Sequence, residues 1–163
     1  MTDYERMEPN YLIEIVNRQK IDGETEEITL TTKGSYMEKN GKRYIVYREY
    51  DQETQEGQTT TLKFDPTGER KTVSLIRHGD NNHNTNLLLE QGQRHLCQYG
   101  TPFGSITLGV FTSKISDRFN ENGGRLSVEY TLDVNTNLSS TNAITVHVKP
   151  FLKQHYKTFE ENS

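Results

Sequence analysis

The chain has 163 residues, of which 31% are hydrophobic and 26% charged, with a net charge of −4 and a pI near 5.7. This length fits one ordinary domain, and a net acidic chain has no general attraction for nucleic acid or anionic lipid. No stretch approaches the roughly 20 apolar residues needed to span a bilayer, and residues 1–10 lack the basic start and apolar run of a signal peptide. The single cysteine, Cys97, cannot form an intramolecular disulfide, so we expect a cytoplasmic protein with a buried, unreactive thiol.

Apolar and polar residues alternate with a period of two along most of the chain, a pattern typical of strands with one buried face. The apolar positions of this pattern are, in chain order, Ile28, Leu30, Val73, Leu75, Ile106, Leu108, Val110, Leu126, Val128, Tyr130, Leu132, Ile144, Val146 and Val148. Threonine is frequent at the polar positions, as expected for a β-branched residue. Because almost no segment shows helical periodicity, the sequence predicts an all-β protein.

Turn residues separate the predicted strands at short intervals. Asn40-Gly41 predicts a type I′ hairpin turn, because this pair readily takes positive φ angles. Further turns are predicted at 65–68, at Gly92, at 101–104 and at 122–124, and the hydrophilic residues 135–142 are expected to link the last two long strands. About ten strands with tight connections form an antiparallel up-and-down meander, which hides its edges best by closing into a barrel over residues 11–149. A two-sheet sandwich is the structural alternative.

The two ends of the chain are expected to lie outside this barrel, as an N-terminal extension of residues 1–10 and a C-terminal extension of residues 150–163. The C-terminal extension carries large side chains at helical spacing. They are Phe151, Leu152, His155, Tyr156 and Phe159, and they follow Pro150. A short helix that plugs one barrel end or packs across a homodimer interface is one interpretation, and a frayed tail is the other.

Three segments resemble one bacterial family. They are residues 94–104 (RHLCQYGTPFG) continuing through Gly109-Val110-Phe111-Thr112, residues 72–79 (TVSLIRHG) and residues 123–130 (GGRLSVEY). These segments are similar to the YwiB-like family, a domain of unknown function with a lipocalin-like (calycin) β-barrel, and the similarity runs in order from Leu12 to Lys149. The resemblance implies an up-and-down barrel of about 8–10 strands in a bacterial protein. It implies no activity and supplies no catalytic or ligand-binding positions.

No arrangement of residues predicts an enzyme, because the sequence has no zinc-site spacing, no nucleophile elbow and no phosphate loop. His78, Asp80 and His83 surround one loop that could hold a metal ion, although a polar turn explains the same residues more simply. The segment 42–44 (KRY) is basic and aromatic, as nucleic-acid-binding barrels are, but the acidic charge of the chain argues against that function. We expect no metal, cofactor, nucleic acid or membrane partner.

Cationic and aromatic residues near the strand ends form the candidate ligand-binding set, which comprises Arg77, Arg94, His95, Tyr47 and Tyr99. Arg77 shares its alternation phase with Val73 and Leu75, so it points inward if they are core residues. A buried arginine must be paired or hydrogen-bonded, so Arg77 either forms an internal ion pair, with Glu49 or Glu129, or anchors an anion. The same alternation puts Arg94 with Leu96, and His95 with Cys97 and Tyr99.

These observations leave two functional hypotheses. The first is a barrel that binds a small, partly apolar or anionic ligand in its interior. The alternative is a protein–protein interaction or structural module whose barrel is filled with side chains, since about eight strands leave little free space. An enzyme ranks last, because no constellation of residues supports one.

Overall fold

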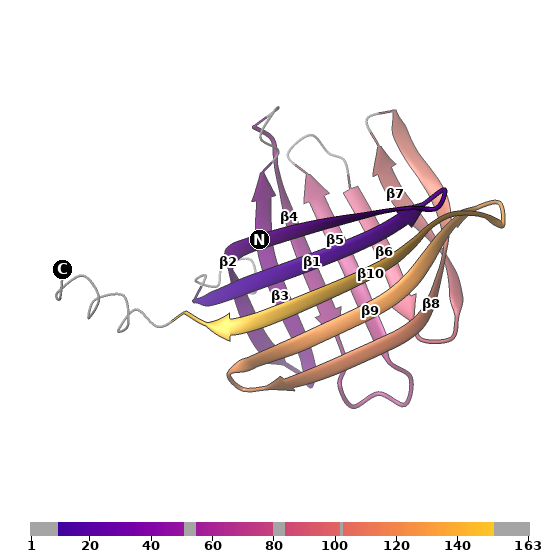
Figure 1. Cartoon of the computed structure of the whole chain (residues 1–163). Helices are drawn as coiled ribbons and strands as arrows, with labels where there is room; N and C mark the ends of the chain where they lie inside the picture. The colour runs from indigo at the N-terminus through magenta and orange to yellow at the C-terminus, as the bar shows by residue number, and fades with distance from the viewer. Residues whose placement is uncertain (1–9, 51–54, 80–83, 102, 152–163) are drawn as a thin grey trace.

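Ten antiparallel strands close into a barrel (Figure 1). The computed structural model describes residues 10–50, 55–79, 84–101 and 103–151. The strands are β1 (Tyr11–Ile21), β2 (Glu24–Lys39), β3 (Lys42–Tyr50), β4 (Gly57–Phe64), β5 (Thr72–Gly79), β6 (Asn84–Glu90), β7 (Arg94–Thr101), β8 (Gly104–Asn120), β9 (Gly123–Val134) and β10 (Asn137–Pro150). Each strand pairs with its neighbours in the chain, and β1 pairs with β10 to close the ring. The up-and-down barrel is confirmed, and the two-sheet alternative is wrong.

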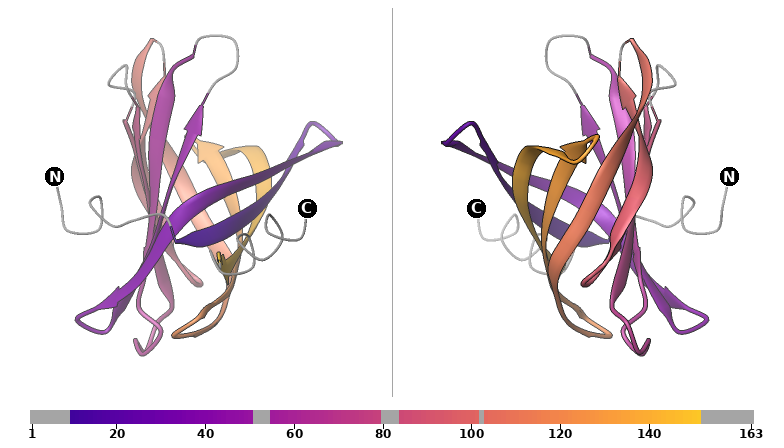
Figure 2. Two further views of the ribbon diagram at one scale, coloured as in Figure 1. Left: turned by 90° about the vertical axis from the view of Figure 1, so that its left-hand side faces the viewer. Right: turned by 90° about the vertical axis from the view of Figure 1, so that its right-hand side faces the viewer.

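The barrel is flattened into two walls. Strands β1, β9 and β10 cross at a steep angle in front of β3 to β7, as Figures 1 and 2 show from three sides. The long strand β8 changes register with β9 between Thr112 and Lys114, and β10 changes register with β9 between Leu138 and Ser140. Each such shift bends its strand, which helps a sheet to curve into a closed wall. Within the described residues there is no helix that could cross a membrane.

Tight turns connect the long strands, with two departures from the sequence prediction: a turn at Asp22 and Gly23 that was not anticipated, and the segment 135–142. Asn40 and Gly41 have φ angles of 54° and 77°, which confirms the type I′ hairpin turn. The segment 135–142 is not a link: a turn at Asn135 and Thr136 suffices, and β10 already begins at Asn137. Its polar residues belong to the strand because they find partners there. Asn142 Nδ2 donates to Ser140 Oγ at 2.9 Å, for example, and both residues are buried.

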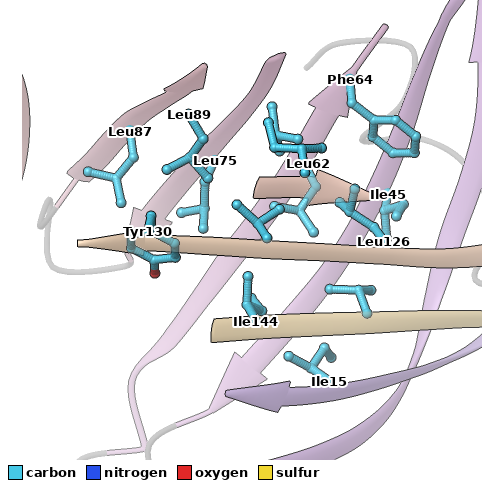
Figure 3. Packing of buried hydrophobic residues seen from close by; sticks show 14 of the residues in the cluster. Ile15, Ile45, Leu62, Phe64, Leu75, Leu87, Leu89, Leu126, Tyr130 and Ile144 are labelled. Atoms are coloured by element: carbon cyan, nitrogen blue, oxygen red, sulfur yellow. The ribbon is translucent and has the colours of Figure 1, made fainter. Parts of the chain in front are cut away.

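On the inner faces of β3 to β7, the side chains of neighbouring strands line up in rows that run across the strands. The row nearest the middle consists of cross-strand neighbours Ile45, Leu62, Leu75 and Leu87, all of which are at most 2% exposed. We call it the leucine row. Together with residues of the front wall, such as Ile15, Leu126 and Ile144, it forms the packed core in Figure 3.

Not every alternating apolar residue is buried. Ile28 is 57% exposed although it lies in the predicted phase, because it pairs with Asn17 in the part of the β1–β2 hairpin that projects from the barrel (Figure 2). Ile106 is 44% exposed and lies next to the β7–β8 connection. Both expectations of burial are wrong, because position along a strand matters as well as phase.

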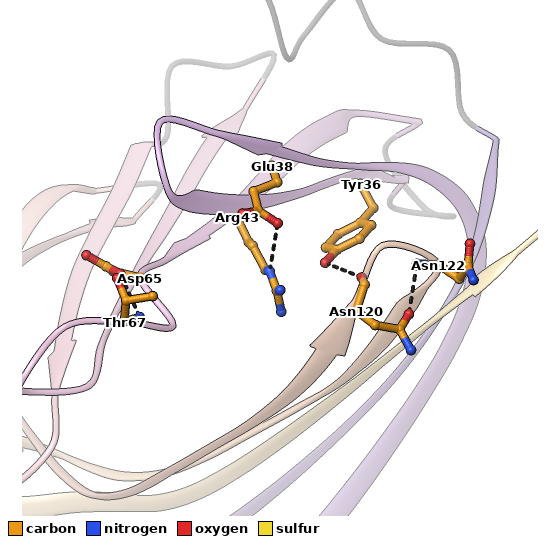
Figure 4. Close-up of polar contacts among 7 residues, drawn as sticks. All are labelled: Tyr36, Glu38, Arg43, Asp65, Thr67, Asn120 and Asn122. Atoms are coloured by element: carbon orange, nitrogen blue, oxygen red, sulfur yellow. Dashed lines mark hydrogen bonds and ion pairs between the residues drawn. The ribbon is translucent and has the colours of Figure 1, made fainter.

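Aromatic residues fill the end of the barrel where β4 and β8 end, which we call the lower end because these strand ends lie at the bottom of Figure 1. The Phe119 ring stacks on Tyr36 and leans on Phe64, with centroids 5.5 and 5.0 Å apart, and the Arg43 guanidinium lies 5.9 Å from its centre. Tyr36 Oη donates to the Asn120 carbonyl at 3.0 Å, and Arg43 pairs with Glu38 at 3.4 Å (Figure 4). Burial raises the pKa of Tyr36, so its hydroxyl remains a donor. The side chain of Arg43 is only 15% exposed, so it belongs to this plug and not to an outer basic surface.

Candidate functional site

Above the leucine row, the next inner row of β3 to β6 is polar. Tyr47 on β3 lies opposite Thr60 on β4, Thr60 lies opposite Arg77 on β5, and Arg77 lies opposite Thr85 on β6. We call these four residues the Arg77 row. They share one level because antiparallel pairing brings every second residue of each strand to the same face. The inward orientation predicted for Arg77 from Val73 and Leu75 is thereby confirmed.

Two tyrosines extend this polar level. Tyr99 on β7 falls opposite Thr85 when the Asn86–Gln98 pair is continued, and the neighbouring Gly100 amide donates to Thr85 Oγ1 at 3.4 Å. Tyr130 reaches in from β9 on the front wall and is 7% exposed (Figure 3). Tyr99 packs against the same core cluster that contains Tyr130. The level is therefore bounded by phenol groups on two sides.

The Arg77 row contains buried polar atoms that are not hydrogen-bonded. Tyr47 Oη, Thr60 Oγ1 and Arg77 Nε are all inaccessible to solvent, and none has a hydrogen-bond partner in the described part of the chain. Tyr47 is 2% exposed and Thr60 is fully buried, whereas Arg77 is half-buried. Buried polar atoms are normally satisfied, because each one left without a partner costs about 1–3 kcal/mol. Three such atoms at one level distinguish this part of the interior from the packed core.

The phenols of the site are neutral hydrogen-bond donors. Burial raises the pKa of Tyr47 to about 12; nearby Glu49 adds to the rise, and Arg77 opposes it. Thr60 and Arg77 lie close enough to Tyr47 to oppose the rise in its pKa, but their buried atoms do not reach hydrogen-bond geometry with its hydroxyl. Burial also raises the pKa of Tyr130, again against the influence of Arg77. The site thus combines one guanidinium with protonated hydroxyl groups at neutral pH.

The internal ion pair considered for Arg77 is not formed within the described residues. Glu129 is exposed on the outer face of β9, which excludes it as a partner. Glu49 lies near Tyr47, but its carboxylate accepts a hydrogen bond of 2.7 Å from Gln58 Nε2, its neighbour on β4. Arg77 therefore has a carboxylate in its vicinity and no direct bond to it.

Arg94 and His95 are not brought together with Arg77. Arg94 lies on the outer face, where its guanidinium makes two bonds of 2.6 and 2.9 Å to the Asp133 carboxylate and holds the pKa of that carboxyl below its usual value. His95 Nε2 lies 2.8 Å from Glu90 Oε1, toward the lower end of β7. Of the five candidate residues, the structure places Arg77, Tyr47 and Tyr99 at one level and engages the other two elsewhere.

Three residues of this level were not anticipated from the sequence, namely Thr60, Thr85 and Tyr130. Thr60 and Thr85 carry no local signal, because only the register of β4 and β6 puts them beside Arg77. Tyr130 could have been found, since it shares its alternation phase with Leu126 and Val128.

The remaining features offer no second centre. Among the described residues there is no cluster of three or more His, Cys, Asp and Glu side chains that could hold a metal ion. Two members of the predicted loop site, Asp80 and His83, lie outside the described residues, as do residues 152–163 of the predicted C-terminal helix. Two surface hollows, of about 410 and 270 Å³, are not lined by Arg77: one lies at the β1–β2 turn, and the other lies over β1, β9 and β10 and has Tyr130 in its lining.

The fold and this polar level define a class: a closed ten-stranded antiparallel barrel of the lipocalin-like type, with an inward-facing arginine. The chain belongs to the family described as Domain of unknown function (DUF1934), whose match covers residues 13–146. Among solved structures it is similar to the ywiB protein from Bacillus subtilis, with a TM-score of 0.73 and 23% sequence identity over 86% of this chain and 90% of that chain. This likeness confirms the fold expected from the family resemblance. No curated protein matches the chain.

Proposed function

We propose that this protein is a binding barrel for a small anionic ligand, held at the Arg77 row. The observation that carries the proposal is the buried Nε of Arg77, which has no hydrogen-bond partner and lies beside two other unpartnered polar atoms. A bound anion would neutralise a guanidinium that has no ion pair within the described residues, and the side chains that cover the three atoms would have to move before the anion could accept their hydrogen bonds.

Binding fits the site better than catalysis does. Arg77, Tyr47, Thr60 and Tyr130 supply donors and one charge, but no nucleophile with an adjacent general base. Arg77 is half-buried, so part of the residue remains accessible to a ligand while its Nε is shielded from water. Shielding strengthens charge-assisted hydrogen bonds, because the local dielectric is low.

The filled barrel with no ligand remains the competing function, and the packed leucine row favours it for the interior below the Arg77 row. A thermal-shift experiment separates the two. The protein is melted with sodium acetate, benzoate, phosphate or sulfate at constant ionic strength, alongside the variants Arg77→Met and Arg18→Met. Arg18 is the matched control, because it lies on the outside of β1 in an exposed pair with Glu27.

A ligand at 100 times its Kd stabilises the folded state by about 2.7 kcal/mol, which corresponds to a rise in Tm of about 5–11 °C for a chain of this size. We expect at least one of these anions to raise Tm in the wild type and in Arg18→Met, and not in Arg77→Met. Equal responses of all three proteins, or no response in any, would establish the filled barrel instead.

We also propose that the protein lies in the bacterial cytoplasm. This location is supported by the buried, unpaired Cys97, which a reducing compartment keeps as a thiol, and by the Bacillus source of the similar structure. Fractionation of cells that express the gene, followed by immunoblotting, tests this location.

A further inference from the structure

We infer that the outer face of β8, β9 and β10 carries a second anion site, which holds the dianionic phosphate group of a small molecule between Arg118 and Arg125. This site lies on the outside of the barrel and does not depend on Arg77. The pairing of the strands, the charges on the face and the donors that the face offers lead to this inference.

Cross-strand pairing places six polar side chains in two adjacent rows on this face. The strands β8, β9 and β10 lie side by side across the front of Figure 1. The first row is Arg118, Arg125 and His147, and the second is Ser116, Ser127 and Thr145. We call these six residues the Arg118–Arg125 face. They point outward because their neighbours in the strands, such as Ile115, Leu126 and Val146, are buried in the core. His147 is already engaged, since its Nδ1 lies 3.8 Å from Glu14 Oε2 on β1.

The two arginines of this face are exposed and lie directly opposite each other. Like charges at opposite positions of neighbouring strands repel and destabilise a sheet. Within the described part of the chain, neither Arg118 nor Arg125 makes an ion pair. Glu14 bonds to Lys149 at 3.2 Å instead, and Glu121, in the β8–β9 turn, pairs with neither arginine. An anion bound between the two guanidinium groups would replace this repulsion with attraction.

Charge and donor number favour a phosphate group over a carboxylate. Two guanidinium groups match the two charges that a phosphate monoester carries above its second pKa of about 6. The Cβ atoms of directly opposite residues are about 4.5–5.5 Å apart, so Arg118 and Arg125 can both reach one group between them. A carboxylate has one charge and two oxygens, which a single arginine already satisfies, whereas a phosphate monoester has three free oxygens for two arginines. The hydroxyl groups of Ser116 and Ser127 add neutral donors on the same face.

The surrounding charges favour a compact ligand over a strand of nucleic acid. The whole chain has a net charge of −4, although this face is positive. Further along the same surface, the exposed Glu129 follows Ser127 on β9, and Glu27 lies on β2 in its pair with Arg18. A polyanion binds through many phosphate contacts, so a strand that extended beyond the two arginines would meet these carboxylates. A single terminal phosphate group needs only the arginines.

An NMR titration that follows the backbone amides measures this binding and locates it. The probes are inorganic phosphate, phenyl phosphate, dimethyl phosphate, benzoate and a single-stranded oligonucleotide, all at constant ionic strength and about pH 8, where phosphate monoesters are dianions. The proteins are the wild type, Arg118→Gln, Arg125→Gln and the control Arg18→Gln. Arg18 is a matched control, because it is exposed on the same side of the barrel and is paired with Glu27. The three replaced side chains are exposed, and the spectra themselves report whether each variant is folded.

We expect inorganic phosphate and phenyl phosphate to shift the amides of residues 116–118 and 125–127 in the wild type and in Arg18→Gln. Each of Arg118→Gln and Arg125→Gln should weaken this binding about fivefold, the upper range for an exposed charge pair. Dimethyl phosphate and benzoate, which carry one charge, should bind about fivefold more weakly than phenyl phosphate. Because this binding does not need Arg77, phosphate should stabilise Arg77→Met as much as the wild type, and the interior site is then decided by acetate and benzoate.

The contrary results are distinct. Phosphate shifts that are absent, that lie elsewhere, or that persist unchanged in both glutamine variants would overturn the site. Equal affinity for benzoate or dimethyl phosphate would overturn the match to a dianion. Binding of the oligonucleotide through these arginines, tighter than that of phenyl phosphate, would overturn the compact ligand and assign the face to nucleic acid. Shifts confined to β5 and dependent on Arg77 would support the proposed function and overturn this inference alone.

Discussion

Replacing Arg77 with methionine should make the protein more stable. Methionine matches the length of the arginine stem and removes the buried Nε, which has no partner and costs about 1–3 kcal/mol by itself. Its loss also removes a weak contact with Tyr47, which Arg77 lies near enough to influence. We expect a net increase of about 1 kcal/mol in the free energy of unfolding, or about 2–4 °C in Tm for a chain of this size.

Urea unfolding measures this change directly. The chain has nine tyrosines and no tryptophan, so tyrosine fluorescence and circular dichroism report the transition. Leu75→Ala is the matched comparison, because Leu75 is the previous inward residue of β5, is 1% exposed and should lose about 2–5 kcal/mol when truncated. If Arg77→Met instead destabilised the protein by more than 1 kcal/mol, Arg77 would be a structural residue, and the argument from its unsatisfied donor would be refuted.

Three further predictions concern pH and a turn. The raised pKa of Tyr47, about 12 against 10.0, contributes about 2–3 kcal/mol of stability that is present below pH 10 and lost between pH 10 and 12; urea unfolding at pH 9 and 11.5 should therefore show a smaller loss for Tyr47→Phe than for the wild type. The lowered pKa of Asp133 means that its bond to Arg94 stabilises the fold above about pH 4; the stability deficit of Asp133→Asn should shrink as the pH falls below this value, and a deficit that did not shrink would contradict this. Gly41→Val should cost about 1–2 kcal/mol, because φ is 77° there, and Lys42→Val in the adjacent strand should cost much less in the same thermal melts.

The fold could be predicted from the sequence because its rules are local. Alternation placed Val73, Leu75 and Arg77 on one face, and an Asn-Gly pair marked a hairpin. A similar signal, Asp-Gly, is present at Asp22 and Gly23, whose φ angles of 50° and 81° form the β1–β2 turn, which was not among the predicted turns. The start of β10 was misplaced because a run of Asn, Ser and Thr resembles a loop until the partners of its polar side chains are known.

The candidate site was only partly predictable, because it depends on register between distant strands. Nothing near Arg94 in the sequence indicates that Asp133 will bind it from β9, and nothing near Thr60 indicates that it will lie between Tyr47 and Arg77. Alternation predicts which face of the sheet a residue lies on. Its neighbours on adjacent strands depend on the register between those strands, which cannot be read from a single sequence.

The join between β6 and β7 gives the barrel wall a weak line. These two strands share a single registered pair, Asn86 with Gln98, and the Leu88 amide donates at 3.3 Å to the Cys97 sulfur, a poorer acceptor than a carbonyl. Breathing of the wall should therefore begin here, and in hydrogen–deuterium exchange the amides along this join should lose protection before those of the other strand pairs. If β6 and β7 separated, the closed barrel would become an open sheet with two edge strands, and Leu88 and Leu96 would lie on its outer surface. How readily the barrel opens in the cell then depends more on the few contacts between β6 and β7 than on the well-packed side chains of the leucine row.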